Sequence, residues 1–291
     1  MTAQHVARPN VNYVATRKKK MWQTLINFIV VFISIMSLIP LFIVLFKSFF
    51  SYDELSKMTK FYVFPNVWTL ENFEFIFTCD RLNIGKSMFW TFLAAVAGVV
   101  SSAVVNTMAG YVFARMEFYG KKLAFACCVT QMFVPGMTTT LTSYIQVAEM
   151  GLLNTFWVLI VPGIASGGTV FFYRQFMLNL PNSLEEAALL DGCGRFQIYW
   201  RIFLPMTKGP MVVMGAGAFI GYWNAWLWPT MTVGQSDYMQ VMQVIKSYET
   251  FYDRADGYTY AAMAITFLIP LVVFLVFQKE ITRGYVLSGL K

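Results

Sequence analysis

Long apolar stretches separated by short polar segments dominate the pattern of this chain. A helix needs roughly 20 mostly apolar residues to cross the hydrocarbon core of a bilayer. The stretches that meet this length are 22–46, 87–113, 123–146, 155–177, 210–230 and 258–277. The pattern therefore predicts an all-α, polytopic membrane protein with six transmembrane helices. Residues 22–278 form its membrane domain, between tails at 1–21 and 279–291, and a long polar loop occupies 179–208.

The first stretch follows Arg17-Lys18-Lys19-Lys20, as the core of a signal peptide would. Its apolar part is longer than the roughly 7–15 residues of such a core, and no small-residue cleavage site follows it. We therefore expect an uncleaved span.

The composition agrees with a membrane protein. Of the 291 residues, 57% are hydrophobic and 13% are charged, whereas soluble domains carry roughly 25% charged residues. Disordered chains are polar and poor in aromatics, so disorder is excluded as well. The four cysteines form no CxxC pair and the single histidine is His5, so no zinc-type ligand set is available and we expect no metal.

The net charge of +7 reflects topology. If the N-terminus is cytoplasmic, 15 of the 22 Lys and Arg residues lie inside and 10 of the 15 Asp and Glu residues lie outside. Membrane proteins concentrate cations in their cytoplasmic loops. We therefore expect a multi-pass membrane protein with both termini in the cytoplasm. No basic patch interleaves with aromatics, so nucleic-acid binding is not expected.

The loop at 179–208 has a pattern of its own. Ser183 and Glu186 have the spacing of a capping box at a helix start, and Gly192 and Gly194 offer the positive φ that ends a helix. A second short helix is expected over 195–203, before Pro205 breaks the pattern. An interfacial hairpin lying among lipid headgroups would also explain such amphipathic helices.

This loop also carries residues at fixed positions whose resemblance to a known motif decides between these interpretations. Glu186-Ala187-Ala188, Gly192 and Ile202-x-Leu204-Pro205 match EAA-x3-G-x9-I-x-LP at every fixed position. The loop thus resembles the EAA loop of bacterial ABC-importer permeases. This resemblance implies that a partner ATPase receives the helix and that its closure drives alternating access. The implied ATPase-coupling residues are Glu185, Glu186, Ala187, Ala188, Asp191, Gly192, Ile202, Leu204 and Pro205.

Further motifs resemble the carbohydrate-importer branch of these permeases, and in particular the smaller, six-span, maltose-type subunit. They are Phe64-Pro65, the segments 69–73 and 109–115, and the segment 223–229. The resemblance implies a chain that forms half of the translocation pathway of a binding-protein-dependent sugar importer. Its partners would be a second permease subunit in a heterodimer, two ATP-binding cassette ATPases and an extracytoplasmic sugar-binding protein.

The chain contains no G-x4-GK[ST] phosphate loop, so ATP and Mg must be bound by the partner ATPases. With one histidine in the N-terminal tail, a Ser/His/Asp or Cys/His catalytic arrangement is not available either. We expect that the chain itself is not an enzyme and has no cofactor of its own.

Polar and aromatic residues inside the spans are candidates for the solute pathway, although hydrogen bonds between helices and anchoring at the membrane interface explain such residues equally well. The candidates are Asn106, Gln131, Trp223, Asn224 and Trp226. In the third external loop, the candidates for contact with the binding protein are Asp237, Tyr238, Tyr252 and Asp253.

Two other functional classes remain as alternatives. A self-sufficient secondary transporter of a small polar solute would favour internal repeats and buried ionisable groups, and the spans show neither. A membrane-bound enzyme would need a cluster of carboxylates or histidines at a membrane face, which is absent. No single residue in the sequence distinguishes among sugars, polyols and glycerol-phosphate esters as the solute.

Overall fold

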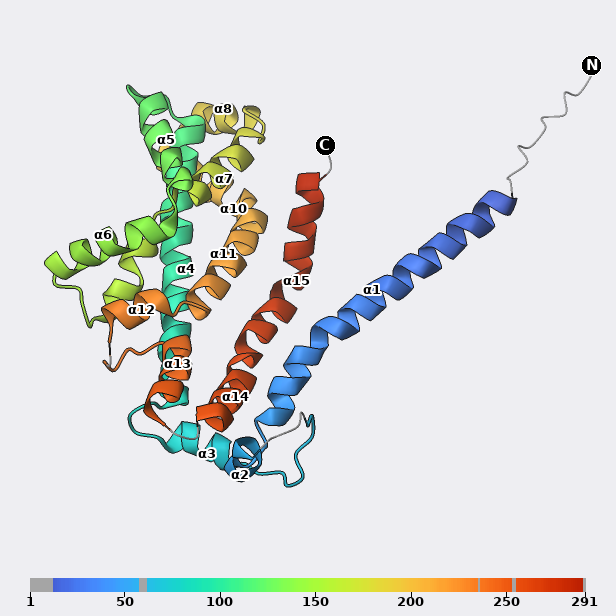
Figure 1. Cartoon of the computed structure of the whole chain (residues 1–291). Coiled ribbons are helices and arrows are strands. Elements are labelled where there is room, and N and C mark those ends of the chain that lie inside the picture. Colours follow the sequence, from blue (N-terminus) through green and yellow to red (C-terminus); the bar gives the residue numbers. More distant parts are fainter. Residues whose placement is uncertain (1–12, 58–61, 235, 253–254, 290–291) are drawn as a thin grey trace, which may run out of the picture.

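The computed structural model describes residues 13–57, 62–234, 236–252 and 255–289, with side chains over 19–57, 62–234, 236–252 and 256–280 (Figure 1). Every regular element in these ranges is helical, which confirms the predicted all-α class. The elements in chain order are α1 (Tyr13–Lys47), α2 (Tyr52–Ser56), α3 (Glu71–Thr78), α4 (Ile84–Arg115), α5 (Lys121–Thr130), η1 (Gln131–Phe133), α6 (Gly136–Glu149), η2 (Phe156–Leu159), η3 (Val161–Gly163), α7 (Gly167–Leu178), α8 (Ser183–Leu190), α9 (Arg195–Ile198), the π-helical turn η4 (Tyr199–Phe203), α10 (Leu204–Met206), α11 (Lys208–Trp223), α12 (Leu227–Thr232), α13 (Val241–Phe251), α14 (Ala255–Thr266) and α15 (Leu268–Gly289).

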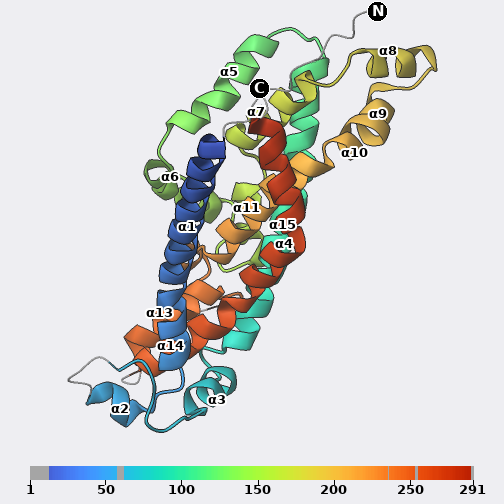
Figure 2. The same ribbon diagram turned by 90° about the vertical axis from the view of Figure 1, so that its right-hand side faces the viewer.

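The helix α4 runs the full height of the molecule and organises the rest. Figures 1 and 2 both place α8 and α5 near one end of it, with the C-terminus, and α2 and α3 at the other. We call these the α8 end and the α3 end. The helices α4 and α7 pack closely at Gly110, which has no side chain: a Cβ there would lie 2.8 Å from the Tyr173 Cβ and 3.1 Å from the Arg174 backbone nitrogen.

Three of the predicted spans are long and apolar enough to cross a membrane without a sharp bend: Lys19–Lys47, Ile84–Arg115 and Asp256–Glu280, the last of which joins α14 and α15 across Phe267. The other three are pairs of helices bent at a break. The pair Lys121–Phe133 and Gly136–Glu149 is bent by 110°, Phe156–Gly163 and Gly167–Leu178 by 48°, and Arg195–Met206 and Lys208–Trp223 by 73°. The total reaches six when each pair counts as one span.

The break in the third span has a local cause. Pro135 has no N–H to donate and disfavours helical backbone in the residue before it, and Val134 is extended, with φ −90° and ψ 120°. The helix therefore ends at Phe133 and restarts at Gly136. The expectation of one continuous helix over 123–146 is corrected in this respect.

The fifth span also differs from the prediction of one helix over 210–230. The helix α11 ends at Trp223, where Asn224 has φ −90° and ψ 0°, and a separate helix α12 begins at Leu227. Pro205 does not break the preceding helix: α10 follows the π-helical turn η4 without a gap and contains Pro205 as its second residue. The bend instead follows Met206, at Thr207.

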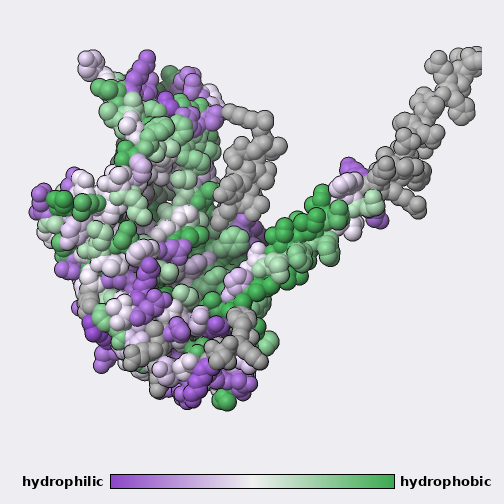
Figure 3. Space-filling model, viewed as in Figure 1, coloured by the Kyte–Doolittle hydropathy of each residue, from purple (hydrophilic) through white to green (hydrophobic). Residues whose placement is uncertain are grey.

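Both terminal spans extend beyond their predicted ends. The helix α1 already begins at Tyr13 and α15 continues to Gly289, so much of the predicted tails at 1–21 and 279–291 is helical. None of the most apolar 18-residue window of α1 is buried. Figure 1 shows α1 leaning away from the helical body, and Figure 3 shows the apolar surface along it.

The core of the α3 end is built around α13. The sequence pattern did not reveal this helix, because it lies inside the predicted third external loop, at about 231–257. Val241, Val244 and Tyr248 lie on one face of α13 and are fully buried against α3, α4 and α14. Thr91 of α4 accepts a hydrogen bond from the Val241 N–H (2.8 Å), and Tyr248 Oη donates to the Leu82 carbonyl (2.7 Å).

We predict that Gly110→Ala destabilises the chain, because the added methyl group meets the α7 backbone. Overpacking of this kind costs about 1–3 kcal/mol. The measurement is the Tm of the full chain in detergent. Gly209→Ala is the matched control, since a Cβ at that position has open space around it. Equal Tm values for the two variants would contradict the close approach of α4 and α7.

Candidate functional site

The helix α8 lies at the centre of the long loop, as predicted, but starts differently. Its N-cap residue is Asn182, whose carbonyl accepts hydrogen bonds from the N–H groups of Glu185 and Glu186, both 3.0 Å long. No side chain caps this end. Ser183 already belongs to the first turn, so the predicted capping box of Ser183 and Glu186 is wrong.

The two glycines after α8 behave differently from each other. Gly192 has φ +78°, the left-handed conformation expected at the end of the helix. Gly194 has φ −72°, which any residue can adopt. It begins the next helix, and its N–H donates to Gln197 Oε1 over 3.0 Å.

One face of α8 is held against the membrane domain. Glu185 is buried and forms an ion pair with Arg195 at the start of α9. One turn later, Ala188 packs into a buried cluster with Tyr111, Met177 and Phe203. These contacts make α8, α7, α9, η4 and the end of α4 one packed unit.

Arg115, the last residue of α4, ties the start of α8 to this unit. Its guanidinium donates to the Asn182 side-chain oxygen and to the carbonyls of Met177 (2.5 Å) and Leu180 (2.6 Å). The planar fork of an Arg suits several acceptors at once. The same guanidinium lies 5.0 Å from the centre of the Phe203 ring.

The path from α8 to the membrane helices is nearly continuous helix. The segments α9, η4 and α10 follow one another without a gap, and η4 is fixed to α4 by a 2.9 Å hydrogen bond between Tyr199 Oη and Thr107 Oγ1. Ile202 and Leu204 pack at the edge of the buried cluster, whereas Pro205 is exposed. The bend at Thr207 then leads into α11.

The opposite face of this unit is exposed. Among the predicted coupling residues, Glu186, Ala187, Asp191 and Gly192 all lie on it. Large apolar side chains accompany them and are exposed to these extents: Leu189 42%, Leu190 89%, Phe196 66% and Trp200 55%. A side chain as apolar and as exposed as that of Leu190 indicates a surface that a partner covers.

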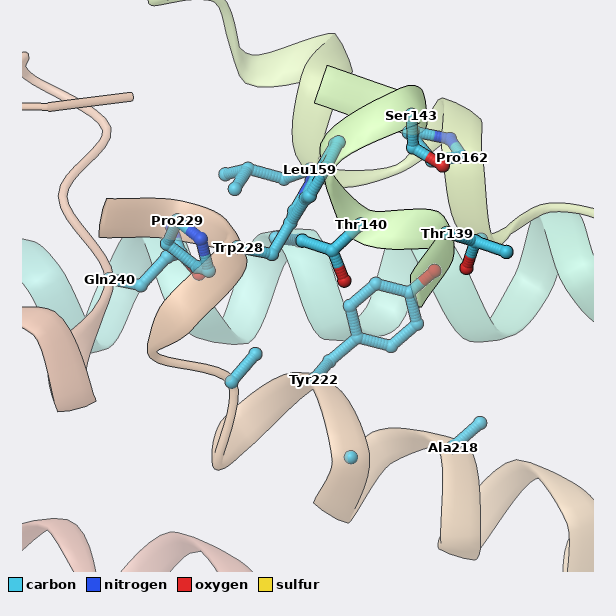
Figure 4. A pocket seen from close by; sticks show the side chains of 14 residues that line it. Thr139, Thr140, Ser143, Leu159, Pro162, Ala218, Tyr222, Trp228, Pro229 and Gln240 are labelled. Atoms are coloured by element: carbon cyan, nitrogen blue, oxygen red, sulfur yellow. The ribbon is translucent and has the colours of Figure 1, made fainter. Parts of the chain in front are cut away.

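Two cavities border α6 on the membrane side. The first, of about 440 Å³, lies between α6, η2, η3, α11 and α12 (Figure 4). The second, of about 730 Å³, lies between η1, α6 and the start of α7. Thr139 and Ser143 of α6 border both of them. Tyr222 of α11 and Trp228 of α12 line the first cavity, and Gln131 lines the second.

Asn106 does not face a cavity, in contrast to its prediction as a pathway residue. It is fully buried, and both ends of its amide are occupied. Its Nδ2 donates to the carbonyls of Ser102 (2.7 Å) and Ile164 (3.0 Å), and its Oδ1 accepts from the Ser166 N–H (2.9 Å). The side chain thus satisfies backbone groups that the break between η3 and α7 leaves free.

The aromatic segment at the end of α11 lies beside the first cavity, but the residues that line this cavity differ from those predicted. Trp223 is buried in the core beside Phe219, which corrects its assignment to the pathway. Asn224 and Trp226 are exposed but line neither cavity, and Lys246 Nζ lies 3.3 Å from the Trp226 ring centre. Because α11 ends at Trp223, the chain turns there, and the neighbouring residues Tyr222 and Trp228 line the first cavity instead.

The candidates for contact with a binding protein also differ in their exposure. Asp237 is exposed and pairs with Lys86 over 2.6 Å. Tyr238 packs on Trp90, and Tyr252 packs against the core with its Oη 3.1 Å from the Cys79 sulfur, so both are half-buried. The hydrogen bond with Cys79 raises the pKa of Tyr252 to about 12. Asp253 lies outside the described residues.

The sequence interpretation missed Tyr222, and the signal for it was weak. Tyr222 fits between Gly98 of α4 and Gly163 of η3, where a side chain on either glycine would overlap its ring. Such a pairing of residues far apart in sequence is invisible in one chain without the fold. Within the described ranges, no group of three His, Cys, Asp or Glu residues gathers to hold a metal.

We predict that Arg115→Met loosens the start of α8, because three acceptors lose their donor. Loss of the charged hydrogen bonds costs about 2 kcal/mol, or roughly a thirtyfold loss of protection. Hydrogen exchange of the α8 amides measures it. Arg201→Met is the control, because Arg201 is exposed and makes no hydrogen bond or ion pair within the described residues. Equal exchange in the two variants would contradict the role of Arg115.

Comparisons with known proteins agree with this geometry. Residues 106–285 match the model of the family described as "binding-protein-dependent transport system inner membrane component". The arabinooligosaccharides transport system permease protein of Halalkalibacterium halodurans is 27% identical over 276 residues, covering 93% of this chain and 96% of that one. The diacetylchitobiose uptake system permease protein of Streptomyces coelicolor is 30% identical over 260 residues, covering 88% and 84%.

A solved structure of a bacterial ABC transporter involved in the import of the acidic polysaccharide alginate shares the fold. Its chain superimposes with a TM-score of 0.79 at 16% sequence identity, covering 90% of this chain and 97% of that one. The resemblance drawn from the EAA loop is thereby confirmed. This chain belongs to the family of binding-protein-dependent transport system inner membrane components.

Proposed function

We propose that this chain is a permease subunit of an ATP-driven carbohydrate importer and that it forms half of the solute pathway. The relatives named above transport arabinooligosaccharides and diacetylchitobiose according to their descriptions. Their coverage of nearly the whole chain supports the same class of solute here. The alternative of a self-sufficient secondary carrier has less support, since the only buried acidic residue described, Glu185, is paired with Arg195 outside the spans.

The observation that carries the proposal is the division of α8 into two faces. Glu185 and Ala188 fix it to the membrane domain, whereas Glu186, Leu189 and Leu190 point outward. A partner ATPase subunit that covers the outward face gains the burial of Leu190, which is worth about 1.5–3 kcal/mol. ATP and Mg are bound by that partner.

The packed unit below α8 supplies the path for the coupling. A push on α8 reaches Arg195 through the ion pair with Glu185, then passes along α9, η4 and α10 to α11. The hydrogen bond of Tyr199 with Thr107 carries the same movement to α4. We infer that ATP-driven closure of the ATPases moves this unit as one body and alternates access to the cavities.

The charges support an orientation with the α8 end in the cytoplasm of a bacterial inner membrane, and hence with both termini inside. Cationic residues gather at that end, as cytoplasmic loops require: they include Arg115, Lys121, Lys122, Arg174, Arg195, Arg201 and Lys208. The α3 end then faces outward, where Asp237 remains available to an extracytoplasmic sugar-binding protein.

The exposed helix α1 supports a second permease subunit as a partner. Its exposed apolar residues lie on more sides of the helix than contact with lipid at one face would explain. The helix leaves the body on the side of α15 (Figure 1). We infer a heterodimer in which the partner permease packs against α1 and closes the cavities beside α6.

We predict that Leu190→Asp lowers ATPase association and solute transport at least tenfold, because it places a charge where an apolar side chain is to be buried. Glu186→Lys and Gly192→Asp act on the same face. The measurements are the co-purification of the ATPase subunit and ATP hydrolysis by the reconstituted complex.

Ser183→Asp is the matched control for this experiment. It adds the same charge to an exposed position of α8, at the end of the helix where negative charge is favourable. Transport unchanged in Leu190→Asp would contradict the proposed docking face. Equal losses in both variants would show that the added charge acts without regard to the face.

A further inference from the structure

The two cavities beside α6 share a wall that has an unusual chemistry. The helix α6 is amphipathic, with Met137, Leu141 and Ile145 exposed on its apolar face. Its hydroxyl-bearing face points the other way, and there Thr139 and Ser143 border both cavities. The cavities are therefore neighbouring compartments separated by one row of hydroxyl groups.

These hydroxyl groups are available to a solute. Thr139 and Thr140 donate to the Gly136 carbonyl, both over 2.9 Å, which leaves their oxygens free to accept. Ser143 makes no hydrogen bond with any residue that the structure describes. Each side chain can thus serve a sugar hydroxyl without losing a bond on which the helix depends.

Tyr222 contributes an aromatic ring from the opposite wall. Figure 4 shows this ring rising from α11 toward Thr139 and Thr140. Its Oη is buried in the gap between Gly98 and Gly163. The surface that Tyr222 offers to the cavity is therefore its ring.

The first cavity also offers an aromatic surface. Trp228 lines it and is held by a 3.0 Å hydrogen bond from its Nε1 to the Val158 carbonyl. With its polar atom already bonded, the indole presents only its apolar surface. Hydroxyl groups combined with such a surface suit the alternating polar and C–H faces of a sugar ring.

Neither cavity offers a charged group. Of the described residues that line them, none is Asp, Glu, Lys, Arg or His. A carboxylate or phosphate entering this part of the membrane would lose its hydration without gaining a cation, which is strongly unfavourable. The lining therefore selects neutral solutes over charged ones. The fold alone does not distinguish solutes by their charge.

We propose that the two cavities form one solute path along the hydroxyl face of α6, and that this path admits neutral carbohydrates and excludes uronates and phosphate esters. The proposal rests on the proposed function and adds the class of solute to it. Thr139, Ser143 and Tyr222 are the binding residues, and each volume is in the range of pockets that hold small ligands.

The test uses the purified complex of this chain with its partner permease and ATPases, without the binding protein, so that only the membrane path selects. Equilibrium dialysis measures retention of labelled galactotriose and trigalacturonate, which differ by a carboxylate in place of each CH2OH group. Arabinotriose, diacetylchitobiose and sn-glycerol 3-phosphate complete the set. We expect retention of at least one neutral probe and of neither anion.

Two variants test the path itself. Thr139→Val keeps the shape of the side chain and removes its hydroxyl, and Ser143→Ala removes the second hydroxyl that borders both cavities. Each should weaken retention of the neutral probe about three- to tenfold, as expected for one hydrogen bond. Thr138→Val is the matched control, since Thr138 is exposed and lines neither cavity.

Retention of trigalacturonate equal to that of a neutral probe would overturn the solute class. Equal affinities for Thr139→Val, Ser143→Ala and Thr138→Val would overturn the path, as would a complex that retains no neutral probe. Co-purification of the ATPase and ATP hydrolysis, measured on the same preparations, report separately on the proposed function.

Discussion

Polar side chains along α4 form hydrogen bonds with backbone and loop groups that would otherwise be unpaired at the bends and ends of neighbouring helices. Inside a bilayer, no water replaces a lost backbone hydrogen bond, so broken helices need protein partners. Thr91 accepts from the start of α13, Asn106 holds both sides of the break before α7, Thr107 bonds to η4, and Arg115 holds the start of the α8 loop. The first and last of these residues lie about 36 Å apart along the helix. The unbroken helix is therefore the frame to which the bent fourth and fifth spans and α13 are attached.

This arrangement connects the α8 loop with the cavities, as the proposed coupling requires. The α8 loop is anchored through Arg115 and Tyr199, and the cavity wall through the glycines that admit Tyr222. Both anchors lie on or against α4. Because α10 leads directly into α11, which carries Tyr222, a displacement of the packed unit around α8 would also move the cavity wall.

Sequence patterns predicted the features that depend on local chemistry. The apolar stretches located the spans, and the spacing from Glu186 to Pro205 located α8 and the family. Long-range contacts decided the rest. Nothing local distinguishes buried Asn106 from exposed Asn224 as a pathway residue, and α13 was hidden because its buried face needs α3, α4 and α14 to cover it. Tyr238 and Tyr252 seemed to belong to a surface loop for the same reason.

The row of hydroxyls shared by the two cavities has a kinetic consequence. A sugar that leaves bulk water must replace its hydration shell, and a passage with separate binding sites would force it to give up one full set of hydrogen bonds before making the next. Along α6, Thr139 and Ser143 remain within reach from either compartment. Bonds can then be exchanged one at a time, so that the solute moves by short steps over low barriers instead of by one complete dehydration.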